Sequence, residues 1–592
     1  MFINTPRVII IGEEKNKMAF YVNNKRIDSF HIKTQGKGQE STAKQFFIDY
    51  SGKLQMEEKE NADFLVSIEK VDAFSNDTFS VELDESNLVF RGGQRGVIYA
   101  VFSFLERIGF RFFTPDLETC PEGDIKAENF FYEESCQFIF RDILSIGATD
   151  KTWSLKQKLN SNLWNARGFT VADGGSYDYA GIPAHSLTGE YLLKPYVKSN
   201  PEYFSLKDGK RITNLQGQIC MTNEDAIEAT VREIFKLLEE NPDKNIVSVS
   251  MGDNENFCEC EKCKAAVKER GLTNVYFDVI CKVARRVKEK RPDVLIHTLA
   301  YINLIRGLDY QLEDNILVQY CHAKCSTHAI TDNICQHHAE AVDQMREMSA
   351  KCSNLQIWHY TNCFKYELLE YPFVHNFLPN MRFFAECGAT GVLNEGMHRF
   401  DENTDFATTY ELRSYLLAKI MWNPHMSEKE YERHISEFCQ AFYGRGYEHI
   451  IAYLNLYKKY AGDCASYDAN KIIDQKVVNA RIIQEEHTMD FINQANSLLN
   501  QALEMAEKVQ RERIEKLKTC VLYYELFWTM RDVLDYGIED EKKEVIRKNK
   551  ELIERIFNQR LVITFWGQSR KMQNEELAGM GEIPPSEWNY KW

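Results

Sequence analysis

The sequence predicts an α/β protein built around a (β/α)8 TIM-like barrel, with a small α/β domain before it and a helical domain after it. Strand-like apolar runs alternate with helices over residues 136–455, as a barrel of parallel strands requires. Residues 1–135 mix short strands with one helix, and residues 456–592 carry a helical pattern. A doubly wound open sheet is the alternative, because the pattern alone does not fix the number of strands.

The first region contains two short strands and one clear helix. Residues 79–83 alternate with a period of two, and residues 88–90 form a second apolar run. Apolar side chains then recur at helical spacing over residues 96–108, and Gly109 can end that helix. The glycine-rich turn before the helix does not match a phosphate-binding fingerprint, so we expect a simple tight turn there.

The middle region supplies the candidate barrel. A helix is predicted over residues 226–240, because its apolar side chains share one face. The candidate strands are residues 138–141, 246–250, 294–299, 316–320, 355–358 and 391–393. In the last region, an apolar stripe over residues 491–506 is typical of a helix packed in a bundle.

Composition and charge exclude several classes of protein. Of the 592 residues, 44% are hydrophobic, which is enough to fill large cores. The net charge is −16, and no basic stripe is present, so a nucleic-acid partner is not expected. No stretch is long and apolar enough to span a bilayer. A carbohydrate is the expected partner, and a homodimer is left open.

The N-terminal sequence and the cysteines indicate a reducing compartment. The apolar run at residues 8–11 is too short for the core of a signal peptide. The 16 cysteines are scattered, several of them within apolar stretches, which is unlike a disulfide framework. The chain as written is therefore expected to be cytoplasmic, although a secreted chain trimmed of its signal would have the same sequence.

Two acids follow the predicted strands at the face where barrel enzymes have their active sites. Glu395 ends the short strand bracketed by glycines, and Asp253 follows the strand at residues 246–250, with Glu255 as its competitor. Glycosidic cleavage needs one protonated and one ionised carboxyl, so Glu395 and Asp253 are the candidate acid/base pair. The alternative is that these acids only cap helices or pair with basic neighbours.

Five further residues are candidates for shaping a sugar site. His185 lies in a loop of small residues, and Arg141 ends the first predicted barrel strand. Arg141 could bind a substrate carboxylate or bridge to a barrel acid. Trp164, Trp358 and Tyr360 are candidate stacking platforms, although each would also fit a core.

A cluster of cysteines directly follows the Asp253 loop. Cys258, Cys260 and Cys263 fall within six residues, and three thiolates can bind one zinc ion if a fourth ligand completes the site. Cys321 and Cys325, after another predicted barrel strand, are the candidate fourth ligands. A structural zinc and a set of reduced cysteines without metal are weighed equally, and catalysis is expected to require no cofactor.

Several segments also carry a family resemblance, which covers most of residues 80–450. Residues 95–111 resemble the helix of the small α/β domain before the barrel in family 20 hexosaminidases and family 67 α-glucuronidases. Residues 201–211, the Asp253 loop and the cysteine cluster resemble a bacterial family described mainly as a domain of unknown function and related to those hydrolases. Residues 415–424 and 442–444 are similar to the segment that closes the barrel in the α-glucuronidases.

The resemblance implies a glycoside hydrolase that acts on the ends of oligosaccharides or glycoconjugates, with glucuronic acid as one candidate sugar. Family 20 enzymes have adjacent Asp and Glu residues at the fourth strand, whereas Asn254 separates Asp253 from Glu255 here. Two other functions stay open: a zinc-dependent hydrolase of amide or ester bonds, and a carbohydrate-binding barrel without catalysis.

Overall fold

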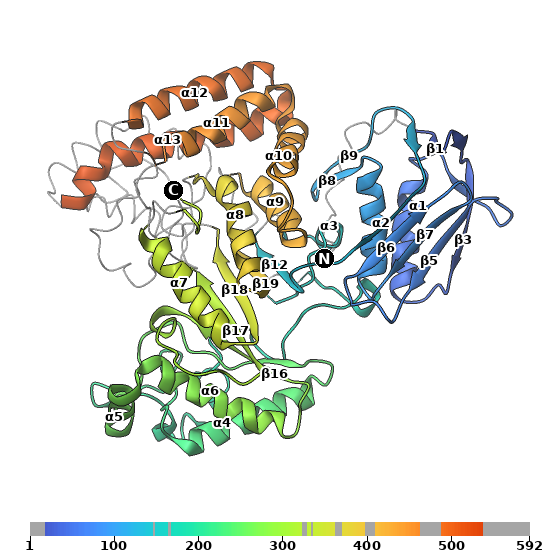
Figure 1. Ribbon diagram of the computed structural model, residues 1–592. Helices are drawn as coiled ribbons and strands as arrows, with labels where there is room; N and C mark the ends of the chain where they lie inside the picture. The colour runs from blue at the N-terminus through green and yellow to red at the C-terminus, as the bar shows by residue number, and fades with distance from the viewer. Residues whose placement is uncertain are drawn as a thin grey trace, which may run out of the picture.

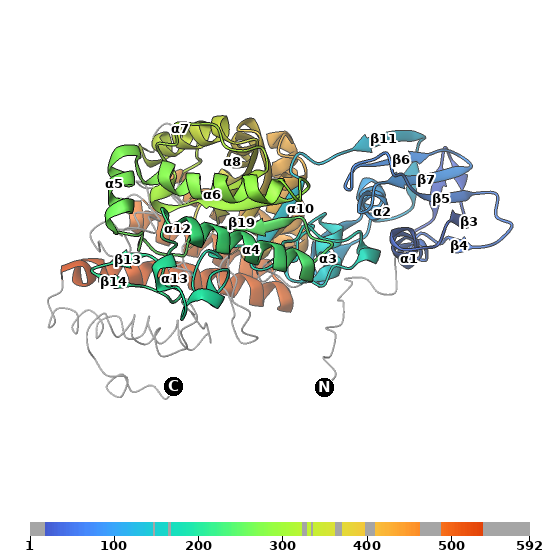
Figure 2. The same cartoon turned by 90° about the horizontal axis from the view of Figure 1, so that it is seen from below.

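The computed structural model combines N-terminal α/β sheets, a parallel TIM-like half-barrel sheet and C-terminal helices (Figures 1 and 2). It describes residues 18–145, 148–163, 167–322, 328–332, 336–361, 370–396, 409–461, 483 and 487–536. The apolar run at residues 8–11 lies outside these ranges. Within them, no helix has both the length and the apolar character that crossing a membrane requires.

The N-terminal part is a six-stranded mixed sheet with two helices packed against it. In spatial order its strands are β11 (Phe130–Glu134), β6 (Phe79–Leu83), β7 (Asn87–Gly92), β5 (Leu65–Lys70), β3 (Ser29–Thr34) and β4 (Glu57–Glu58). The helices are α1 (Gln39–Ser51) and α2 (Gly96–Arg107). Strand β6 has the predicted bounds, and α2 confirms the helix expected after the glycine-rich turn.

Smaller strands complete this part of the chain. One sheet contains β10 (Ile125–Ala127), β1 (Phe20–Val22) and β2 (Lys25–Arg26), and a hairpin contains β8 (Arg111–Thr114) and β9 (Leu117–Thr119). The core beneath the large sheet is rich in aromatic rings, with Phe47, Phe90 and Phe104 in mutual contact.

The barrel sheet has six parallel strands, which lie close to the six predicted runs. In spatial order they are β12 (Phe140–Leu144), β19 (Ala389–Glu395), β18 (Asn354–Tyr360), β17 (Ile316–His322), β16 (Leu295–Ala300) and β15 (Ile246–Ser248). Every neighbouring pair is parallel, so all six carboxyl ends meet at one edge. The first and the last of these strands along the chain, β12 and β19, are neighbours in the sheet.

Two irregular segments connect the outer strands β12 and β15. The amide of Asn160 donates to the carbonyl of Arg141 in β12, and the amide of Tyr177 donates to the carbonyl of Asn160. The amide of Ala180 then donates to the carbonyl of Ile246 in β15. The sequence predicts a barrel of eight strands. In the described residues six of the strands are regular, and the two irregular segments pair only by single parallel bridges.

Helices surround this sheet and continue into the C-terminal part (Figure 1). Those that follow the barrel strands are α3 (Lys151–Lys156), α4 (Glu224–Glu240), α5 (Glu261–Arg270), α6 (Leu272–Lys288), α7 (Gln336–Lys351), α8 (Phe373–Glu386) and α9 (Tyr410–Trp422). The C-terminal helices are α10 (Glu428–Tyr443), α11 (Tyr447–Lys459), α12 (Thr488–Met505) and α13 (Lys508–Tyr536). Helix α12 contains the predicted apolar stripe, which packs against α11 and α13.

A buried ionic cluster joins the N-terminal part to the barrel. Asp77, in the turn before β6, accepts from Arg95 Nε at 2.5 Å and from an Arg141 guanidinium nitrogen at 3.3 Å. Asp77 is 3% exposed and Arg141 is fully buried. The Arg141 guanidinium also donates to the carbonyls of Lys158 and Phe138, and it lies over the ring of Trp422. One carboxylate therefore neutralises two buried guanidinium groups from different parts of the fold.

We predict that Asp77→Ala lowers the free energy of unfolding by about 3–5 kcal/mol, because it leaves Arg95 and Arg141 buried without their carboxylate. Urea denaturation measures the change. Asp72→Ala is the control, since the Asp72 side chain is 89% exposed, and it should change stability by no more than about 0.5 kcal/mol. Equal effects of the two variants would contradict a structural role for the cluster.

Candidate active site

Glu395 is the last residue of β19 and reaches the edge of the sheet where the strands end. In the parallel register it is paired with Leu144 of β12 and Tyr360 of β18. A Cβ atom on Gly391 would lie only 2.6 Å from Phe140 Cβ, so glycine allows β12 and β19 to approach closely. Only 8% of Glu395 is exposed. The strand therefore holds a carboxyl group in a largely buried position.

The surroundings of Glu395 favour its protonated form. Burial raises the pKa of the carboxyl group, a hydrogen bond from Trp358 lowers it, and the charge of Asp253 raises it again, to about 7 in total. The Trp358 indole Nε1 donates to Glu395 Oε2 at 2.7 Å. A carboxyl group with this pKa can both give and accept a proton near neutral pH.

Asp253 lies in the loop after β15 and is exposed. The hydroxyl of Tyr301, which follows β16, donates to Asp253 Oδ1 at 3.0 Å. His185 has a φ of 54°, and its Nδ1 lies 2.9 Å from the carbonyl oxygen of Met251 at the start of the same loop. The His185 and Tyr301 rings are 6.3 Å apart. Tyr301 therefore contacts the carboxylate itself, while His185 contacts the backbone of its loop.

The charges of Glu395 and Asp253 act on the same buried thiol. Burial raises the pKa of Cys321, in β17, well above its usual range, and the charges of Glu395 and Asp253 add to this effect. The Cys321 thiol is therefore one group on which the charges of both acids act. Glu255 instead contributes to the field around Lys207, whose pKa is raised mainly by its bond to Glu259. Asp253, whose charge also acts on Glu395, stays the candidate partner of that residue.

An apolar and aromatic floor lies beneath the two carboxyl groups. Its buried members are Phe140, Leu144, Ala184, Leu299, Cys321, Trp358 and Leu393. Tyr360 and Tyr301 are partly buried against this group. The rings of Trp358 and Tyr360 stack with centroids 6.3 Å apart, so the candidate platforms adjoin Glu395. Flat apolar surfaces next to polar groups suit the faces and hydroxyls of a sugar.

Arg141 does not lie where a sugar-binding residue is needed. It pairs with Val392, three residues before Glu395, which corresponds to about 10 Å along the strand. Its guanidinium is buried and bonded to Asp77 of the N-terminal part rather than to a barrel acid. The expectation that Arg141 binds a substrate carboxylate is corrected accordingly. Trp164 lies outside the described residues.

Four cysteine thiols gather beside the Asp253 loop. The thiols of Cys220, Cys258, Cys260 and Cys263 all lie within 4.8 Å of one another and could hold a structural metal such as zinc. The fourth thiol is Cys220, in the segment before α4, rather than Cys321. Cys321 lies in the barrel floor, and its sulfur is 4.0 Å from the carbonyl oxygen of Gln319. Cys325 lies outside the described residues.

The sequence signals for two site residues were weak. Tyr301 directly follows a predicted strand, so the strand-end rule could have selected it, but tyrosine carries no acid or base signal. Cys220 stands 38 residues before Cys258 without a cysteine near it in the sequence. Only the fold brings Cys220 to the other three thiols.

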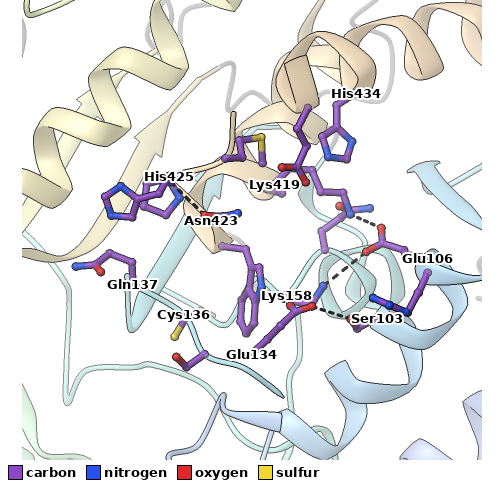
Figure 3. Close-up of a pocket in the computed structure, with 18 of the residues that line it drawn as sticks. Ser103, Glu106, Glu134, Cys136, Gln137, Lys158, Lys419, Asn423, His425 and His434 are labelled. Carbon is purple, nitrogen blue, oxygen red and sulfur yellow. Dashed lines mark hydrogen bonds and ion pairs between the residues drawn. The ribbon is translucent and has the colours of Figure 1, made fainter. Parts of the chain in front are cut away.

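A separate cavity of about 710 Å³ lies between α2, the start of β12 and the end of α9 (Figure 3). In it Glu106 contacts both Lys419 and Lys158. Burial would raise the Glu106 pKa, but these two ammonium groups outweigh burial and lower it to about 2. The lining residue Gln137 precedes β12, so the cavity lies at the opposite end of the strand from Glu395. We assign it to the packing between the two parts of the fold.

Solved structures with similar folds include three glycoside hydrolases. A GH138 enzyme targeting pectin rhamnogalacturonan II is 11% identical, with a TM-score of 0.45 over 95% of this chain and 96% of the other. A β-N-acetylhexosaminidase from Bacteroides fragilis is 12% identical, with a TM-score of 0.41 over 69% and 90%. CpGH84B is 11% identical, with a TM-score of 0.39 over 93% and 96%.

Among curated proteins, no sequence matches this chain significantly. The relation to family 67 α-glucuronidases therefore stays a prediction. A family model does match, over residues 112–455, and its description is a domain of unknown function, DUF4838. Since that match covers more than half of the sequence, the chain belongs to the DUF4838 family.

Proposed function

We propose that this protein is a glycoside hydrolase in which Glu395 is the general acid/base and Asp253 is the ionised partner. The observation that carries the proposal is the buried carboxyl group of Glu395, whose pKa is raised to about 7 beside the charge of Asp253. Two carboxyl groups whose environments separate their protonation states are what glycosidic cleavage uses.

In the proposed reaction, protonated Glu395 gives its proton to the glycosidic oxygen as the bond to the anomeric carbon breaks. The carboxylate of Asp253 stabilises the positive charge that develops on the sugar. Water then adds its hydroxyl group to the anomeric carbon and gives its other proton to the Glu395 carboxylate, which restores the acid. The hydroxyl of Tyr301 holds the Asp253 carboxylate in one orientation. Trp358 and Tyr360 offer the sugar an aromatic face next to Glu395.

Two earlier alternatives receive less support. A catalytic zinc keeps an open coordination position, whereas four thiolates fill a tetrahedral site, so the cysteine cluster does not favour a zinc-dependent amide or ester hydrolase. Arg141, the residue expected to bind the carboxylate of a glucuronic acid, is buried against Asp77, so the glucuronic acid option now rests on the family resemblance alone. We propose an exo-acting enzyme from the family resemblance, and the release of monosaccharides alone from oligosaccharides tests this mode.

We predict that Glu395→Gln lowers kcat by roughly 10²–10⁴-fold on any glycan or aryl glycoside that the wild type cleaves, because the amide cannot donate the proton. Initial rates across a panel of such substrates measure this loss. Glu239→Gln, on the exposed face of α4, should retain wild-type activity. Glycan binding without turnover by the wild type would instead indicate a carbohydrate-binding protein.

A second comparison distinguishes the roles of Asp253 and Glu255, the two acids in the loop after β15. We expect Asp253→Asn to lower kcat at least tenfold more than Glu255→Gln, because the charge of Asp253 acts on Glu395 while Glu255 lies in the field of Lys207. Steady-state rates on one substrate provide the measurement. A larger loss in Glu255→Gln would move the partner role to that residue.

The pH profile tests the protonation state of Glu395. We predict that kcat/KM falls as pH rises through about 7, where the acid form is lost. The hydrogen bond from Trp358 lowers the Glu395 pKa, so Trp358→Phe should raise it and move the alkaline limb of the profile to higher pH. An alkaline limb at the same pH in both proteins would contradict this assignment.

A further inference from the structure

The spacing of the four thiols fits one tetrahedral metal ion. Cys220 Sγ lies 3.6 Å from Cys258 Sγ and 3.8 Å from the sulfurs of Cys260 and Cys263. Zinc–thiolate bonds of about 2.3 Å place the sulfurs of a tetrahedral site about 3.8 Å apart. A disulfide would instead bring two sulfurs to about 2.05 Å, and all four cysteines are free. The geometry therefore favours an ion among four sulfurs over bonds between them.

The groups around the sulfurs stabilise thiolates. The amide of Leu206 donates to Cys258 Sγ at 3.3 Å, and the guanidinium of Arg211 lies 3.8 Å from the same sulfur. Cys260 is the N-cap of α5 and Cys263 is in its first turn, where the helix dipole favours negative charge. Four thiolates and one Zn²⁺ carry a net charge of −2, which the guanidinium of Arg211 and the amide of Leu206 partly offset.

We propose that Cys220, Cys258, Cys260 and Cys263 bind one structural zinc ion, which fixes the loop bearing Asp253. The ligands come from two segments, 220 and 258–263. Cys260 directly precedes α5, which Figure 2 shows at the same end of the molecule as the hairpin of β13 (Leu206–Lys207) and β14 (Lys210–Arg211). In the sequence these two segments are separated by 37 residues, which include α4 and β15. The ion would connect the two ends of this stretch of chain.

Gln218 links the proposed metal site to the loop that bears Asp253. It stands two residues before Cys220 in the same segment, and its side-chain amide bonds to the backbone on both sides of Asp253. The amide of Gly252 donates to Gln218 Oε1 at 3.0 Å, and Gln218 Nε2 donates to the carbonyl of Asn254 at 3.0 Å. Because the metal fixes Cys220 relative to Cys258, it also fixes Gln218 relative to the Asp253 loop. This positioning role rests on the proposed function, whereas the metal site does not.

Metal analysis of the purified protein tests the site directly. We expect one zinc per chain, and after exchange with Co²⁺ the visible spectrum of a tetrahedral cobalt site with four thiolates. Cys220→Ser should lose most of the zinc and Cys220→His should retain it, because imidazole is also a zinc ligand. Cys439→Ser, at a buried thiol in α10, should keep one zinc. A wild-type chain without zinc, whose four thiols react with a thiol reagent before any chelator is added, would overturn the proposal.

Gln218→Ala tests the positioning role separately, since it leaves every proposed ligand in place. We expect this variant to keep one zinc per chain and the cobalt spectrum, while kcat falls roughly tenfold or more and KM changes less. Unchanged kcat with bound zinc would refute positioning through Gln218. If zinc binds but the wild type cleaves no glycoside, the proposed function fails and the metal site stands.

Discussion

The removal of one carboxyl group from water is the constraint on which the candidate site depends. Glu395 is held between β12 and β18 by the parallel register, and burial is the largest influence on its pKa. The indole of Trp358 compensates part of this cost through its hydrogen bond to the carboxyl group. Without that bond the pKa of the carboxyl group would be higher, and its charged form would be less accessible. The sheet thus sets the chemistry of the residue at its edge.

A second requirement is a partner charge that stays accessible to solvent. Asp253 meets it from a loop whose backbone is held by Gln218 on both sides of the residue and whose carboxylate is held by Tyr301. The two acids therefore differ in environment, although we propose that they act in one site. One is on a strand and buried, and the other is on a loop and exposed. The proposed mechanism uses this difference, because it needs one carboxyl group removed from water and one exposed to it.

The sequence predicted the strands and the position of Glu395 because local patterns determine both. Period-two and continuous apolar runs mark buried strands, and an acid at the end of such a strand is visible without any knowledge of its neighbours. The partner of Arg141 could not be predicted in this way. Asp77 precedes it by 64 residues and lies in the turn before a strand of another sheet. Cys220 and Gln218 were missed for the same reason, since their roles come from contacts that only the folded chain creates.

The shared carboxylate of Asp77 has a consequence for how this chain can be divided. The family match begins at residue 112, after Asp77 and Arg95, whereas Arg141 lies within it. A fragment cut at that boundary would contain a fully buried guanidinium without its counter-ion. The N-terminal sheet and the barrel thus form one electrostatic unit, although each has its own hydrophobic core.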